Sequence, residues 1–177
     1  IEETGAAQYY RDAKILTIYE GTTAIQANDL VGRKTARDGG TGAKSIAAQI
    51  ARTEAELLAS PNADAQAMGK RLKAAREAFI DVVDFIAANT RSNPNAAFSG
   101  SVPYLMLAGN LVAGWQMGRA LLVALMPEAQ AQDAAFMAAK VTTARFYADH
   151  ILSKVPGIRD SIVEGAGSVT ALPLEAF

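Results

Sequence analysis

Hydrophobic residues recur at helical spacing along almost the whole chain, and no strand-like alternation persists. Residues 7–18 are predicted to form a short helix. A break follows at 19–22, and Thr22 can cap a second helix that runs to about Ala36. The segment 38–42 then holds three glycines and is the best candidate for a linker.

The apolar stripes after this linker predict two helices of strong period. The first stripe ends at a stop-and-restart signal, Ser60-Pro61-Asn62, and the second ends near 92–95. The stripes comprise Ile46, Ile50, Thr53 and Leu57 in the first helix, and Met68, Leu72, Ala75, Phe79, Val82 and Ile86 in the second.

Two further helices are predicted in the second half of the chain. The first, about 99–126, is very apolar. Pro127 is expected to open the last long helix, which carries a stripe from Met137 to Val155. Pro156-Gly157 is expected to terminate that helix, and a short helical turn is expected near 158–163.

The fold class is therefore predicted as all-α, with two parts. Short connections between the four long helices favour antiparallel neighbours and an up-down bundle over residues 43–177. The two helices within residues 1–38 resemble the end of a different helical domain. Within the third helix, Gly114 and Gly118 form a small-residue motif that suits close packing of helices in a soluble bundle better than a membrane span.

Composition narrows the function classes. The 177 residues include 17 Lys and Arg and 18 Asp and Glu, so the net charge is −1 and no basic stripe suggests a nucleic-acid partner. The absence of cysteine excludes disulfides, thiolate nucleophiles and Cys-based zinc sites. We expect a cytoplasmic protein without a metal. The single histidine, His150, is interpreted as a helix-packing residue.

Candidate chemistry concentrates between the first two helices, where Glu20 stands between an aromatic residue and a glycine. A partly desolvated carboxylate in such a loop would have a raised pKa and could act as a base near neutral pH. Gly21 would allow a ligand to approach the backbone closely. Thr22 and the first amides of the next helix would offer hydrogen-bond donors. A solvated loop carboxylate without function is the alternative that spacing alone leaves open.

Two short motifs around this loop resemble the C-terminal signature of acyl-CoA dehydrogenases. They are Arg-Asp-Ala-Lys-Ile at 11–15 and Tyr-Glu-Gly-Thr-Thr-Ala-Ile-Gln at 19–26. The remainder of the chain resembles the extra helical domain of the larger members. The stretch 24–34 looks most like the 3-methylmercaptopropionyl-CoA dehydrogenase group.

The resemblance implies oxidation of an acyl-CoA thioester to the trans-2-enoyl-CoA, with FAD as hydride acceptor and electron-transfer flavoprotein as electron acceptor. It implies that Glu20 is the catalytic base and that Tyr19 and Gly21 line the acyl-CoA site. Thr22, Thr23 and Ala24 match the turn that contacts FAD. Many relatives carry Gln or Glu at position 24, so alanine leaves only backbone contact there.

A complete family member also has an N-terminal helical domain and a middle β domain, which hold most of the FAD and CoA contacts. We therefore expect this chain alone to be inactive and not to retain flavin, whereas the parent enzyme is expected to be a homodimer. The alternative is a helical oligomerisation or docking module over 43–177 without chemistry of its own. A membrane-anchoring bundle is a weaker variant.

Overall fold

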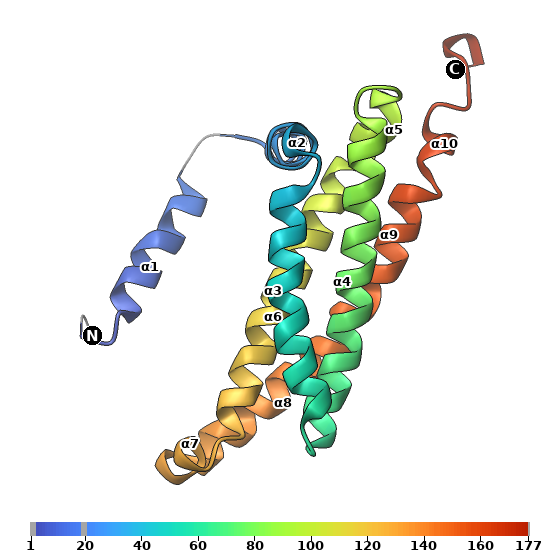
Figure 1. The fold of residues 1–177 in the computed structure, drawn as a ribbon. Helices are drawn as coiled ribbons and strands as arrows, with labels where there is room; N and C mark the ends of the chain where they lie inside the picture. Colours follow the sequence, from blue (N-terminus) through green and yellow to red (C-terminus); the bar gives the residue numbers. More distant parts are fainter. Residues whose placement is uncertain (1–2, 19–20, 177) are drawn as a thin grey trace.

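The computed structural model describes residues 3–18 and 21–176, and these residues contain helices and no strands (Figure 1). The all-α prediction is confirmed. The α-helices are α1 Ala6–Lys14, α2 Thr23–Asp29, α3 Thr41–Ala59, α4 Ala63–Asn89, α5 Pro94–Ser99, α6 Ser101–Ala124, α7 Pro127–Gln132, α8 Ala134–His150, α9 Val155–Val163 and α10 Ala166–Val169. Short 3-10 or π segments are η1 Ile15–Thr17, η2 Leu30–Thr35, η3 Ala36–Asp38, η4 Leu152–Lys154 and η5 Leu174–Ala176.

The helices after η3 form an antiparallel bundle. Helices α3, α4 and α6 run alternately down and up in Figure 1, and α8 followed by α9 supplies the fourth position. Helix α4 contacts α3, α6, α8 and α9, and α6 contacts α3, α4, α8 and α9, so these two helices are central to the bundle. The short connections that the sequence predicted join each helix to an antiparallel neighbour.

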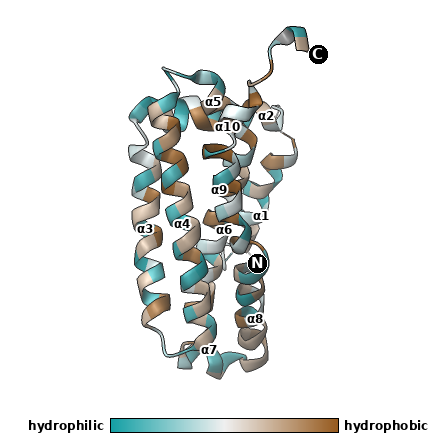
Figure 2. Ribbon diagram, turned by 90° about the vertical axis from the view of Figure 1, so that its right-hand side faces the viewer, coloured by the Kyte–Doolittle hydropathy of each residue, from teal (hydrophilic) through white to brown (hydrophobic). Residues whose placement is uncertain are grey.

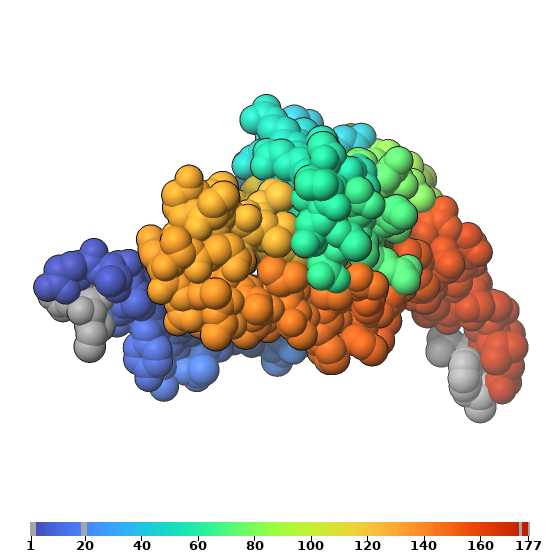
Figure 3. Space-filling model, turned by 90° about the horizontal axis from the view of Figure 1, so that it is seen from below, coloured from blue at the N-terminus to red at the C-terminus, as the bar shows by residue number. Residues whose placement is uncertain are grey.

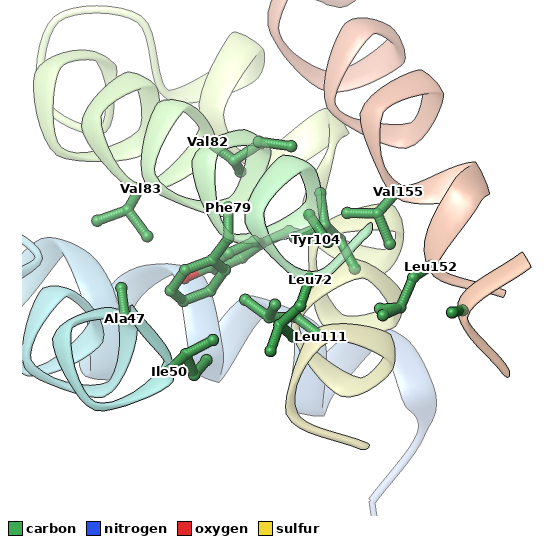
Figure 4. Close-up of a cluster of buried hydrophobic side chains, with 14 of the residues drawn as sticks. Ala47, Ile50, Leu72, Phe79, Val82, Val83, Tyr104, Leu111, Leu152 and Val155 are labelled. Carbon is green, nitrogen blue, oxygen red and sulfur yellow. The ribbon is translucent and has the colours of Figure 1, made fainter. Parts of the chain in front are cut away.

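The core of the bundle is apolar and contains side chains from all of its long helices (Figure 4). Along α4, the predicted stripe from Met68 to Ile86 is buried as expected. Asn62 caps this helix by accepting hydrogen bonds from the amides of Asp64 and Ala65 at 2.9 and 3.0 Å. Figure 2 shows hydrophilic and hydrophobic segments alternating along α3 and α4, as expected for helices that bury one face.

The predicted linker is a tight turn in the structure, because only Gly39 and Gly40 separate η3 from α3. Gly39 and Gly40 have φ angles of 65° and 82°, a left-handed conformation that favours glycine. A Cβ on Gly40 would come within 2.5 Å of Val83, so a side chain could not fit there. Val31, which precedes this turn, packs within the bundle core. The division into residues 1–38 and 43–177 stays a prediction.

The fourth long helix differs from its prediction. Pro127 opens only the short α7, and α8 begins after Asp133, whose side chain accepts a 2.9 Å hydrogen bond from the amide of Phe136. At the other end, α8 ends at His150, and Pro156 lies in the first turn of α9. The expectation that Pro156 terminates the last helix is wrong, because a proline that breaks one helix is also compatible with the first turn of the next.

The small residues of α6 allow close packing of helices, as predicted. A Cβ on Gly114 would come within 2.6 Å of Leu152, and a Cβ on Gly118 within 3.0 Å of Leu57. The helix spans Ser101–Ala124, close to its predicted range of about 99–126, and Gly100 separates it from α5. Within the described part of the chain, no helix has both the length and the apolar character that a membrane span needs.

The interpretation of His150 as a packing residue is wrong for this chain. His150 is exposed, and its ring lies against Phe146 with the ring centroids 4.5 Å apart. Phe146 is itself 59% exposed. The stripe that contains both rings is therefore on the outer side of α8.

Candidate functional site

The candidate site lies in the segment that joins α1 to α2. Tyr19 and Glu20, the predicted substrate contact and catalytic base, lie outside the described residues. Gly21, Thr22, Thr23 and Ala24 are described, and all four are exposed. The four residues are consecutive, with Thr22 as the N-cap and Thr23 and Ala24 as the first residues of α2.

The local backbone explains why glycine and threonine follow position 20. Gly21 has a φ of 146°, which side chains rarely allow. Thr22 is extended, and its hydroxyl oxygen accepts a 3.3 Å hydrogen bond from the amide of Ile25. The amides of Thr23 and Ala24 belong to the first turn, where helical amides have no acceptor within the helix. The turn thus presents backbone donors on an exposed surface, and its contact with a cofactor stays a prediction.

Helix α1 presents the first part of the signature on an open surface. Arg11 and Asp12 do not pair with each other. The Gln8 amide donates to Asp12 at 2.8 Å, and the Arg11 guanidinium donates to the Gln8 carbonyl oxygen at 3.3 Å. These bonds link successive turns of one exposed helix, so their effect is local to α1.

The described residues from 3 to 25 include no buried residue. Large apolar side chains there are exposed, with Tyr9 at 79% and Leu16 at 71%. The others are Tyr10, Ile15, Ile18 and Ile25. A base of raised pKa needs desolvation or a nearby negative charge. Ile18 and Gly21, the nearest described residues on either side of positions 19 and 20, are exposed.

The bundle shows no catalytic cluster in the residues that the structure describes. No group of three His, Cys, Asp or Glu side chains there could hold a metal ion. Burial raises the pKa of Tyr104, but its hydroxyl lies 2.9 Å from that of Thr35 and the two satisfy each other. Burial also raises the pKa of Tyr147, whose hydroxyl donates to the carbonyl of Asn110 at 3.2 Å.

Sequence reasoning missed the polar contacts inside the bundle. Thr35 continues the spacing of Ala27 and Val31, and a polar residue in such a stripe is a signal for a buried hydrogen bond. The other missed contact is the ion pair between Glu54 and Arg76, with 2.7 Å between Oε2 and Nε. These contacts position helices and do not form a reaction centre.

Comparison with known proteins gives a consistent result. Residues 43–173 match the model of the family described as acetyl-CoA dehydrogenase C-terminal like. The chain is 48% identical over 174 residues to a 3-methylmercaptopropionyl-CoA dehydrogenase of Ruegeria pomeroyi. It is 33% identical to the broad-specificity linear acyl-CoA dehydrogenase FadE5 of Mycobacterium tuberculosis and 32% identical to a butyryl-CoA dehydrogenase of Syntrophomonas wolfei.

These matches extend over nearly all of this chain and over a minor part of each relative. The match to the relative from Ruegeria pomeroyi covers 98% of the chain, the match to the one from Mycobacterium tuberculosis 96%, and the match to the one from Syntrophomonas wolfei 100%. Each match covers 29% of the relative. The chain therefore spans less than a third of the length of the relatives that it matches.

Proposed function

Because this chain belongs to the acyl-CoA dehydrogenase family, we propose that it forms the C-terminal part of an enzyme that oxidises an acyl-CoA thioester to the trans-2-enoyl-CoA. The observation that carries the proposal is the signature at 19–26, of which the described part is an exposed turn with positive φ at Gly21 and a capped helix start at Thr22. This proposal concerns the longer enzyme.

In this enzyme Glu20 removes the α-proton of the bound thioester. Its carboxylate is activated when the remainder of the enzyme covers the turn, because desolvation raises the pKa of a carboxyl group. Tyr19 and Gly21 line the acyl-CoA site, and the absence of a side chain at Gly21 lets the thioester approach the backbone.

The residues of this chain fit one edge of a flavin site and not a whole one. Thr22 and Thr23 supply hydroxyls, and Thr23 and Ala24 supply first-turn amides, all on an exposed surface. These residues would hold that edge of FAD, which would supply a hydride acceptor for the β-hydrogen and a path for electrons to electron-transfer flavoprotein. We propose that this chain alone holds no flavin tightly and is inactive.

The bundle from α3 onward has a structural role in the same proposal. It presents no cluster of catalytic groups among its described residues, so we propose that it supports a homodimer of the cytoplasmic parent enzyme. A bundle that acts purely as an oligomerisation or docking module is the second candidate. It is favoured by the buried core of the bundle, which contains no side chain from the described residues between 3 and 25, called here the signature segment.

The test is flavin bleaching under anaerobic conditions in the longer enzyme, with a panel of acyl-CoA thioesters. The relative from Ruegeria pomeroyi makes 3-methylmercaptopropionyl-CoA the first thioester to try. We expect Glu20→Gln to bind the thioester yet to bleach flavin about 10² to 10⁴ times more slowly, the usual contribution of a general base.

Glu56→Gln is the matched control, because Glu56 is exposed on α3 and belongs to the bundle. It should bleach like the wild type. If Glu20→Gln also bleaches like the wild type, the base lies elsewhere. The second candidate, an oligomerisation or docking module, is then favoured.

A further inference from the structure

The outer side of α6 is an uncovered apolar surface. Its exposed residues recur at helical spacing and include Val102, Met106, Gly109, Gln116, Ala120 and Val123. Met106 and Val123 are 55% and 51% exposed, and Arg119 is the only charged residue within Ser101–Ala124. A helix that is apolar all round is normally buried, and a contiguous exposed apolar patch marks an interaction surface.

Two hollows lie end to end along this surface. The first, of about 480 Å³, is lined by α6 residues from Tyr104 to Val112 and by residues of η2, α3 and α4. The second, of about 490 Å³, is lined by α6 residues from Gln116 to Ala124, by Tyr9 of α1 and by residues of α8. The distance from Tyr104 to Ala124 is about 30 Å along a helix axis. The surface that lacks a cover therefore follows nearly the whole of α6, which suits a protein surface.

The charged residues that line the two hollows are all cationic. Lys34 lines the first hollow and Arg119 and Lys140 line the second, whereas no described Asp or Glu lines either one. Arg119 donates a 3.0 Å hydrogen bond to the side chain of Gln116, and the Lys140 ammonium lies 4.9 Å from the ring centroid of Phe136. None of the three cations forms an ion pair with another described residue. A cover with acidic side chains at its flanks would complement them.

A second copy of this surface would be a poor cover. In a twofold contact the same patch lies on both sides of the interface. Lys34, Arg119 and Lys140 would then approach the cations of the other copy, and no acidic residue that lines the hollows could compensate them. Like charges brought together across an interface oppose association, so the charge pattern favours a cover of different sequence.

The position of α1 indicates where such a cover comes from. Tyr9 lines the second hollow, and Tyr10 and Leu16 leave further apolar area exposed on α1 and η1. The matches cover 29% of each relative, and in the proposed enzyme the remaining chain enters α1 from upstream. That chain reaches α1 beside the second hollow, so a surface that covers α1 also reaches the outer side of α6.

We propose that the part of the longer enzyme upstream of α1 packs an apolar face, flanked by acidic side chains, along the outer side of α6 and covers both hollows. This inference rests on the longer enzyme of the proposed function. It identifies the surface by which the bundle joins the rest of that enzyme.

The test is the rate at which a maleimide labels single introduced cysteines, read by peptide mass spectrometry in the 177-residue chain and in the longer enzyme. Val112→Cys lies in the first hollow and Val123→Cys in the second, whereas Ala74→Cys, exposed on α4, lies in neither. In the longer enzyme we expect both hollow positions to react at least about tenfold more slowly than in the 177-residue chain, because a covered thiol reacts only when the contact opens. Ala74→Cys should react equally fast in both proteins. Unchanged rates in the hollows, or equal protection of Ala74→Cys, would overturn the proposal.

Two further measurements identify the cover. Lys140→Glu should accelerate the labelling of Val123→Cys in the longer enzyme, because it places like charges together, whereas Lys70→Glu, at an exposed lysine of α4, should not. An unchanged rate in Lys140→Glu would overturn the acidic cover. The 177-residue chain should stay reactive at Val112→Cys as its concentration rises, and protection by a concentration-dependent dimer would show that a second copy is the cover.

The labelling needs neither substrate nor flavin bleaching, so its outcome is independent of the catalytic test. A longer enzyme that protects both hollows but does not bleach flavin would support this inference and refute the proposed function. One that bleaches flavin and leaves both hollows reactive would overturn this inference alone.

Discussion

The signature segment and the bundle differ in where their apolar side chains lie. The described residues from 3 to 25 bury none of them, although Tyr9, Leu16 and Ile18 are large and apolar. The bundle buries a continuous core that includes Leu72, Leu111 and other residues of its long helices. Viewed from below, α1 and the C-terminal tail lie at opposite ends of the molecule (Figure 3).

The contrast teaches that stability and candidate chemistry are separated in this chain. Among the described residues, every buried side-chain polar atom has a hydrogen-bond partner. The signature segment has the sequence of a site but no cover for its apolar residues. In the proposed function, its chemistry would depend on surfaces of the longer enzyme.

The largest contrast is expected from removing one leucine in each region. Leu72 is fully buried, so Leu72→Ala should lower the free energy of unfolding by about 2 to 5 kcal/mol. Leu16 is 71% exposed, so Leu16→Ala should change it by less than about 0.5 kcal/mol. Urea denaturation followed by circular dichroism measures both. Equal losses would show that the segment folds as part of the bundle.

Removing a charged contact should also cost more stability in the bundle than in α1, with a smaller difference between the two regions. The side chains of Glu54 and Arg76 are 10% and 16% exposed, so Glu54→Ala leaves the largely buried Arg76 with only its 3.8 Å contact to Glu77 and should cost about 3 kcal/mol. Asp12→Ala removes a bond on the exposed face of α1 and should cost less than about 0.5 kcal/mol. Urea midpoints again provide the measurement, and a cost of Asp12→Ala above 1 kcal/mol would contradict the account.

The effect of tyrosine ionisation on the free energy of unfolding should also differ between the two regions. Burial raises the pKa of Tyr104 in the folded chain above the unfolded value of about 10. The unfolded chain therefore loses this proton first, so the contribution of Tyr104 to stability should be constant below about pH 10 and fall as the pH rises above it. Tyr104→Phe should reduce this alkaline loss but lower stability at neutral pH by about 1 to 3 kcal/mol, because the Thr35 hydroxyl loses its partner.

Tyr10→Phe is the control in the signature segment, because Tyr10 is 79% exposed on α1. Its unfolding free energy should follow the wild type from pH 7 to pH 11. An alkaline loss that Tyr104→Phe leaves unchanged would refute the assignment to Tyr104.

The smallest effect is expected at the junction of the two regions. Thr22→Ala removes the cap of α2 and should destabilise that helix by about 1 kcal/mol, which corresponds to about fivefold faster exchange of the Ile25 amide. Thr23→Ala, at an exposed position within the first turn, should leave the exchange rate unchanged. Equal effects of the two substitutions would mean that the cap does not hold the turn.

Much of the bundle could be predicted from the sequence because its helices carry clear apolar stripes. The stripe from Met68 to Ile86 and the cap at Asn62 follow local rules of spacing and hydrogen bonding. The break before Pro156 could not be placed, because proline suits the first turn of a helix as well as its end. The contact of Thr35 with Tyr104 joins residues 69 positions apart, which no local pattern encodes.

The candidate site was identified by motif and not by periodicity. Apolar spacing shows which face of a helix is apolar but does not show whether this chain covers it, so the exposure of Tyr9 and Ile18 could not be predicted. The cap at Thr22 was predicted and is confirmed. The roles of Tyr19, Glu20, Gly21, Thr23 and Ala24 stay predictions.

Native-state hydrogen exchange on the 177-residue chain tests the separation of the two regions most directly. We predict that the amides of buried α4 residues such as Leu72 and Val82 exchange only through global unfolding. The amides of Tyr9, Tyr10 and Arg11 in α1 should exchange nearly as fast as in an unfolded peptide. Protection of α1 equal to that of α4 would contradict the account, because the signature segment would then be an integral part of the folded bundle.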